Sequence, residues 1–159
     1  RKKKKMAHLK ILIDNQQKKK IPTDTIRKKT KQILSALGCD AHEISIVITD
    51  DDQVQELNKQ YRGIDNPTNV LAFPMQEGQF SDITPGLLGD VVISCDTALK
   101  EAEKANITLL ERMSQLLIHG ILHLLGFDHE KGPEDQKEMQ DKSHELLRQI
   151  EKNKNLDTF

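Results

Sequence analysis

One segment, from Thr108 to Leu125, restricts the possible folds of this chain more than any other. Thr108-Leu109-Leu110-Glu111 has the pattern of a helix N-terminal capping box, and apolar residues then occur nearly all round the predicted helix. A helix that is apolar on every side belongs in the protein interior, packed against a sheet. The same helix carries His119 and His123 near its C-terminal end. We therefore expect these histidines to be held by a rigid core element.

Three of the six histidines lie within eleven residues, at a spacing that suits one metal ion. His119 and His123 are four residues apart, so on a helix they project from the same face, about 6 Å apart along the axis. Gly126 permits a turn after the helix, and His129 can then return to the same ion. Three neutral imidazoles bind Zn²⁺ at roughly 2.0–2.1 Å and leave a fourth position open, as in catalytic zinc sites. The spacing predicts one Zn²⁺ per chain.

The segment has the spacing of the long zinc-protease motif H-E-x-x-H-x-x-G-x-x-H but differs from it at position 120. In those proteases the glutamate of the motif is the general base on the metal-bound water, whereas this chain has Gly120. A metal cage without that base indicates different chemistry. Two histidines four residues apart can also be hydrogen-bonded core residues, but Gly126 and His129 at the matching offsets favour metal ligands.

The rest of the chain alternates between strand and helix patterns. Strands are predicted over 8–13, 44–49, 69–73 and 87–94. Helices are predicted over 23–37, 51–61, 96–106, 109–125 and 133–152. Asp50, Asp51 and Asp52 begin the second of these, where acids favour the positive end of the helix dipole, and Asp96 is the expected cap of the third. Four strands with helices on one side of the sheet make a single α+β domain. We expect this domain over 8–152, after a basic N-terminal tail over 1–7 and before a C-terminal tail over 153–159.

The net charge of −1 hides a strong charge asymmetry along the chain. Residues 1–31 hold 13 basic and 2 acidic residues, whereas residues 32–159 hold 11 basic and 23 acidic residues. Such asymmetry is typical of a basic surface for a polyanionic partner, and equally of a solvated helix face around Arg27, Lys28, Lys29 and Lys31. The five aromatic residues form no stacking platform of the kind found on RNA-binding sheets, so phosphate contacts and shape would carry RNA affinity.

The composition also indicates the cellular compartment and the state of the two cysteines. No apolar run reaches membrane-spanning length without a charge or histidine, and no signal-peptide pattern is present, so we expect a soluble cytoplasmic protein. Cys39 and Cys95 form no C-x-x-C pair. They are expected to be buried thiols rather than a disulfide or metal ligands.

Three segments together resemble the YbeY family of bacterial endoribonucleases that act in ribosomal RNA maturation. The first is His119-Gly120-x-Leu122-His123-Leu124-x-Gly126-x-Asp128-His129. The second is Tyr61-Arg62-Gly63-Ile64-Asp65-Asn66-Pro67-Thr68-Asn69-Val70-Leu71-Ala72-Phe73-Pro74, and the third is Leu88-Gly89-Asp90-Val91-Val92-Ile93. They occur in the expected order, and the resemblance covers about residues 8 to 150.

This resemblance implies a mixed sheet covered by helices, a zinc-hydrolase-like histidine helix, and a zinc site in a cleft. It implies a zinc-dependent single-strand endoribonuclease that processes the 16S rRNA 3′ end and acts in ribosome quality control. The expected partners are RNA and ribosomal particles, including ribosomal proteins, and no membrane partner is expected.

Arg62 is the candidate catalytic residue outside the metal site. A guanidinium can hold a phosphate in two-point contact and offset charge that develops on phosphorus. From the residues alone, a surface ion pair with Asp65 is the simpler interpretation, but the position matches the functional arginine of the family. Asp90 could orient a ligand histidine or cap a strand end, and Asp128 could do the same or stabilise a local turn.

The sequence leaves two main hypotheses for the function, which belong to different classes of protein. One is the endoribonuclease, whose zinc would activate water or polarise a phosphoryl oxygen. The other is a ribosome-assembly binding protein in which zinc mainly holds the fold. A metallohydrolase of another substrate is a third, which Gly120 disfavours for peptides. The coordination sphere separates the first two, because an open fourth position favours catalysis.

Overall fold

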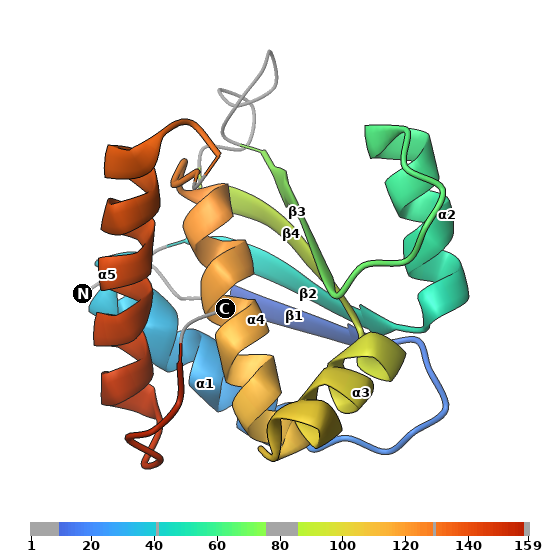
Figure 1. Cartoon of the computed structure of the whole chain (residues 1–159), viewed down its shortest axis with the longest axis horizontal. Helices are drawn as coiled ribbons and strands as arrows, with labels where there is room; N and C mark the ends of the chain where they lie inside the picture. The colour runs from blue at the N-terminus through green and yellow to red at the C-terminus, as the bar shows by residue number, and fades with distance from the viewer. Residues whose placement is uncertain (1–9, 41, 76–85, 129, 158–159) are drawn as a thin grey trace, which may run out of the picture.

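The structure, a computed structural model of the chain, describes residues 10–40, 42–75, 86–128 and 130–157 (Figure 1). The elements in these ranges are β1 (Lys10–Asn15), α1 (Thr23–Ala36), β2 (Glu43–Thr49), α2 (Asp51–Arg62), β3 (Val70–Pro74), β4 (Leu87–Ser94), α3 (Cys95–Ala105), α4 (Leu109–Leu124) and α5 (Pro133–Ile150). The first two residues of the predicted strand over 8–13 lie outside these ranges, as does the predicted basic tail over 1–7.

The described strands form one mixed sheet in the order β1-β2-β4-β3. β1, β2 and β4 are parallel, and β3 runs antiparallel to β4 with Phe73 opposite Asp90. The predicted α+β fold is confirmed, and β4 has the predicted bounds. β3 lies at an edge of the sheet, so it pairs with β4 on one side and has no neighbouring strand of this sheet on the other.

Helices lie on both faces of the sheet, so the expectation of helices on one side is wrong. Residues from α1, α3, α4 and α5 share the larger core, in which α4 is central (Figure 1). α2 instead packs on the opposite face, where Val54 meets Leu71 and Val92. The reason is that β4 is apolar on both faces: Val91 and Ile93 enter the larger core while Val92 faces α2. A strand buried on both sides needs cover on both sides.

The helix N-termini follow the sequence signals with one exception. Thr108 and Glu111 form the predicted capping box of α4, and Asp50 accepts a hydrogen bond from the Gln53 N–H at the start of α2. The cap of α3, however, is Ser94 and not Asp96. Asp96 accepts a hydrogen bond from the Asp51 backbone N–H at 3.0 Å and pairs with Lys19, and these contacts hold the pKa of Asp96 below its usual range.

Both cysteines are buried free thiols, as predicted, and burial raises the pKa of each. A protonated, buried thiol is a poor metal ligand, because the thiolate is the form that binds metals. No helix in the described part of the chain is long and apolar enough to cross a membrane.

One lysine of the basic helix α1 points inward. Lys29 forms an ion pair with Glu151, just after α5, and the side chains are only 12% and 10% exposed. Ser114 of α4 donates a hydrogen bond to the same carboxylate. Nearby, Leu156 is buried and Gln115 Nε2 donates to the Asp157 carbonyl at 2.7 Å, so the segment that was expected to be a tail packs against α4 as far as Asp157. Lys29 is therefore a structural residue and does not belong to the possible RNA-binding surface.

Replacing Lys29 by alanine should lower the free energy of unfolding by about 3 kcal/mol, because the Glu151 carboxylate would stay buried without its counter-charge. The measurement is urea unfolding followed by circular dichroism. Lys28→Ala is the matched control, since Lys28 is exposed and its loss should change stability by less than about 0.5 kcal/mol. Equal effects of the two substitutions would contradict a structural role for Lys29.

Candidate active site

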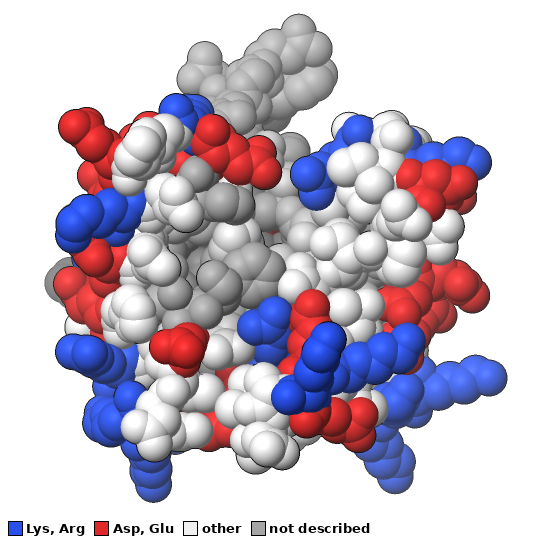
Figure 2. All heavy atoms as spheres, viewed as in Figure 1, with Lys and Arg blue, Asp and Glu red and all other residues white. Residues whose placement is uncertain are grey.

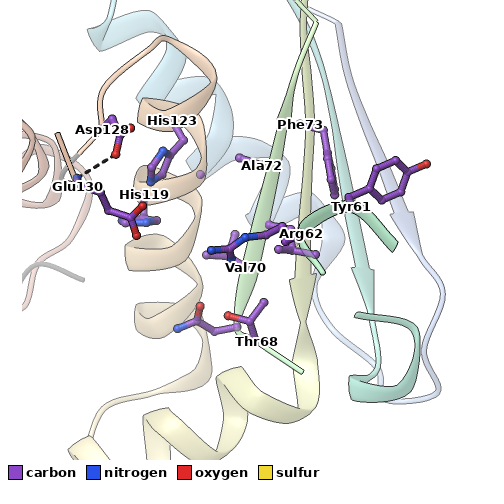
Figure 3. A pocket seen from close by; sticks show the side chains of 13 residues that line it. Tyr61, Arg62, Thr68, Val70, Ala72, Phe73, His119, His123, Asp128 and Glu130 are labelled. Carbon is purple, nitrogen blue, oxygen red and sulfur yellow. Dashed lines mark hydrogen bonds between the residues drawn. The ribbon is translucent and has the colours of Figure 1, made fainter. Parts of the chain in front are cut away.

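A cavity of about 560 Å³ opens between α4, the edge strand β3 and the C-terminal end of α2 (Figure 3). Its walls come from segments far apart in the sequence. The lining residues are Tyr61, Arg62, Thr68, Asn69, Val70, Leu71, Ala72, Phe73, His119, Gly120, His123, Asp128 and Glu130. The structure therefore brings Arg62 and two of the three predicted metal ligands to the same cavity.

His119 and His123 lie on the cavity side of α4, as their spacing predicts. Their ring centroids are 4.6 Å apart with an interplanar angle of 66°. Two partly exposed imidazoles this close on a rigid helix suit a shared metal ion. The third predicted ligand, His129, lies outside the described residues, and the described part of the chain contains no group of three or more potential metal ligands. The three-histidine set therefore stays a prediction.

The chain turns sharply after α4, as the glycine predicts. Gly126 has a φ of +96°, a left-handed conformation that disfavours other residues. The Phe127 N–H returns to the Leu122 carbonyl at 3.0 Å and closes the end of the helix. Asp128 then accepts a hydrogen bond from the Glu130 N–H at 2.9 Å, across position 129. Asp128 thus stabilises the local turn, one of the two roles expected for it.

Gly120 is required by the packing of α4 against the sheet. A Cβ at this position would lie 2.8 and 3.2 Å from the two methyl carbons of Val91 and 3.4 Å from Val70. Val91 is fully buried in β4 and cannot move aside easily. A glutamate base therefore cannot occupy position 120 unless α4 moves away from the sheet, which gives a physical reason for the departure from the protease motif.

Arg62 ends α2 and extends across the cavity toward α4 (Figure 3). Gly63 follows in the left-handed conformation, with φ +72°, and terminates the helix. The predicted alternative, an ion pair between Arg62 and Asp65, does not form, and the Asp65 carboxylate instead accepts from Gln55 Nε2 at 2.9 Å. Arg62 is exposed and has no ion pair with any described residue. Its charge is thus available to an anionic ligand.

Asp90 lies on the other face of the sheet from the histidines. Side chains alternate along a strand, so Asp90 shares the face of Val92, which packs in the cluster with α2. Asp90 is also absent from the cavity lining. This placement does not support the idea that Asp90 orients a ligand histidine on α4.

The sequence interpretation missed several polar residues of the cavity. Asn69, just before β3, donates from Nδ2 to the Glu101 carboxylate at 3.1 Å, and Glu101 in turn pairs with Arg112 of α4 at 2.7 Å. These contacts tie β3 to α3 and α4 and fix one end of the cavity. Glu130 also lines the cavity beside the histidines (Figure 3). Asn69 belongs to the second segment of family resemblance, but no local pattern identifies Glu101 or Arg112 as its partners.

Comparisons with known proteins agree on one family. The family model described as Endoribonuclease YbeY matches residues 12–151. A curated Endoribonuclease YbeY from Syntrophus aciditrophicus is 45% identical over 139 residues, which cover 86% of this chain and 87% of that protein. Another, from Aquifex aeolicus, is 46% identical over 135 residues and covers 85% and 88%. A protein from Thermotoga maritima, known from a solution structure, matches with a TM-score of 0.60 at 27% identity, over 87% of this chain and 89% of that one.

Replacing Gly120 by alanine should destabilise the protein although alanine favours helices. The gain in helix propensity is about 1 kcal/mol, while overpacking a core typically costs about 1–3 kcal/mol, so we expect a net loss of about 1 kcal/mol. Urea unfolding of the single and double variants checks this. In a Val91→Ala background the collision is removed, and Gly120→Ala should then be neutral or stabilising. The same loss in both backgrounds would show that Val91 does not restrict position 120.

Proposed function

Because the chain belongs to the Endoribonuclease YbeY family, we propose that it is a zinc-dependent endoribonuclease that acts on ribosomal RNA during its maturation in the cytoplasm. Membership in this family implies a metal-dependent nuclease. The observation that carries the proposal is the cavity in which His119 and His123 on one wall face Arg62, whose charge has no ion-pair partner among the described residues. Together these groups suit a phosphodiester better than a peptide.

His119, His123 and His129 would hold the zinc ion. Three neutral imidazoles and one open position are the ligand set of catalytic zinc, although such a site also takes Ni²⁺, Co²⁺ or Cu²⁺. When bound, the metal supplies a Lewis acid that polarises a phosphoryl oxygen or acidifies a water molecule. α4 contributes rigidity, because its buried face fixes where His119 and His123 project.

Arg62 would bind the scissile phosphate opposite the histidines. The planar guanidinium donates two parallel hydrogen bonds to phosphate oxygens, which positions the phosphodiester between the two walls. As negative charge builds up on the phosphoryl oxygens, the same contacts become stronger and stabilise the transition state. Gly63 and the contacts of Gln55 and Asn58 with the following loop keep the end of α2, and so Arg62, in place.

The competing hypothesis is a ribosome-assembly protein in which zinc only holds the fold. The buried residues of α4 complete the larger core without His119 and His123, which are only partly buried at the cavity. A metal at this site would therefore add little to the core packing. This supports a chemical role for the ion over a structural one.

Removal of the metal should abolish cleavage and leave the fold intact. We expect the purified protein to contain about one Zn²⁺ per chain and to cut an rRNA precursor. His123→Ala should lose most of the zinc and the cleavage, as should chelation of the wild type, with circular dichroism nearly unchanged. His144→Ala on α5, outside the cavity, is the control and should keep both. Full zinc occupancy in His123→Ala would refute the ligand set, and cleavage by the chelated protein would refute metal-dependent catalysis.

Replacement of Arg62 should separate catalysis from metal binding. Arg62→Ala should keep the zinc and reduce the single-turnover cleavage rate by about 10²–10³, the typical cost of losing one preorganised contact. Arg62→Lys should recover activity only in part, because an ammonium cannot reproduce the planar two-point contact. Lys59→Ala, one turn earlier on α2 and outside the cavity, is the matched loss of charge and should cleave normally. Wild-type rates in Arg62→Ala would remove Arg62 from the mechanism.

A further inference from the structure

We propose that Tyr61 forms a nucleobase-stacking subsite, which holds a base that flanks the phosphate at Arg62. This inference rests on the proposed cleavage of RNA and adds to it a second, uncharged contact with the substrate. The only tyrosine of the chain lies in the wall of the cavity and is 61% exposed.

Exposure alone would mean little, because single apolar residues are common on protein surfaces. Tyr61 differs from such residues because its ring is held by a neighbouring ring and because it lines the cavity. Its ring meets that of Phe73 at a centroid distance of 5.3 Å and an interplanar angle of 64°. Phe73 is itself packed against the smaller core of Val54, Leu71 and Val92. Tyr61 therefore rests edge-to-face on a fixed neighbour, and Phe73 does not stack on its faces.

The position of Tyr61 relative to Arg62 matches the two parts of a nucleotide. The two residues are consecutive in the last turn of α2, so their side chains leave the helix about 100° apart. In Figure 3, Arg62 extends toward the histidines, whereas the Tyr61 ring lies beyond Phe73, away from them. Arg62 and Tyr61 thus offer contacts of two kinds on one wall of the cavity, which suits a phosphate and a neighbouring base.

The surface charge favours such an uncharged contact. On the face in Figure 2, basic and acidic side chains are interspersed, and no area of one sign dominates. Phosphate contacts on this face alone would then give limited affinity. Stacking on an aromatic ring contributes about 1–3 kcal/mol per base and tolerates every base. The subsite would therefore bind single-stranded RNA of any sequence at this position.

The sequence offers a direct spectroscopic test in the unaltered protein. The chain has no tryptophan, so its tyrosine emission comes from Tyr61 alone. In stopped-flow mixing with single-stranded RNA, stacking should quench this emission in the binding phase, before cleavage. Free N-acetyltyrosinamide mixed with the same RNA corrects for absorption by the bases. Unchanged emission at RNA concentrations that saturate binding would overturn the proposal and would favour a contact of the exposed ring with a protein partner.

Kinetics of designed variants test the same contact without fluorescence. Tyr61→Leu keeps apolar bulk against Phe73 but lacks a π-face, and should raise the half-saturating RNA concentration by roughly 5- to 100-fold with little change in the maximal single-turnover rate. Tyr61→Phe should behave as wild type. Ile64→Ala is the control, because Ile64 is an exposed apolar residue just after α2, in the loop that follows it, and does not line the cavity. Thermal unfolding of each variant checks that the fold is kept.

RNA that lacks one base identifies the stacked nucleotide. With wild-type protein, one abasic position near the cleaved bond should raise the half-saturating concentration as much as Tyr61→Leu does. In Tyr61→Leu the same abasic position should cause no further rise in the half-saturating concentration. Equal abasic penalties in both proteins would overturn the subsite even if RNA cleavage is normal. Absence of cleavage by the wild type would instead overturn the proposed function, and the fluorescence measurement would still decide the base contact.

Discussion

The close approach of α4 to the sheet at Gly120 determines the geometry of the whole cavity. Because position 120 has no side chain, the helix lies directly on Val91 and Val70, and the next turn packs Leu124 beside Gly89. At Gly89, with φ +139°, a Cβ would lie 2.2 Å from the Phe73 carbonyl oxygen, so glycine is required on the sheet side as well. The two glycines allow the contact from opposite sides. They set the distance between the histidines of α4 and the edge strand β3, and so the width of the cavity.

The opposite wall depends on a second set of contacts, which are polar and local. Asn58 Nδ2 donates to the Asn66 carbonyl at 2.8 Å, and Gln55 holds Asp65, so the loop after α2 folds back on its own helix. Asn69 then joins this loop to Glu101 of α3. The wall that carries Tyr61 and Arg62 is therefore fixed at both ends of the loop. Rigid walls of different chemistry, imidazole on one side and guanidinium with an aromatic ring on the other, make the cavity suitable for a bound nucleotide.

Features that depend on neighbours in sequence could be predicted, and those that depend on distant contacts could not. The capping box at Thr108, the turn at Gly126 and the bounds of β4 all follow from local patterns, and the structure contains them. The same local reasoning assigned Asp96 as a helix cap, but Asp96 bonds the start of α2, which is 45 residues away. Lys29 looked like one of several solvated lysines, yet its partner Glu151 lies 122 residues further along the chain. The position of α2 could not be predicted either, because the apolar pattern of β4 does not specify which helix covers each of its two faces.

The candidate site shows the same division between local and distant information. Spacing alone placed His119 and His123 on one face of a helix, but the cavity exists only because β3 and the end of α2 come to lie opposite that face. The surroundings of Tyr61 follow from this. In the sequence it is one of five scattered aromatic residues with no stacking pattern, and only the fold places it beside Phe73 at the same cavity as Arg62. Arg62, which has no ion pair with a described residue, and the exposed ring of Tyr61 lie on the last turn of the same helix. Together they would bind a phosphate and a base, which scattered surface lysines would not do.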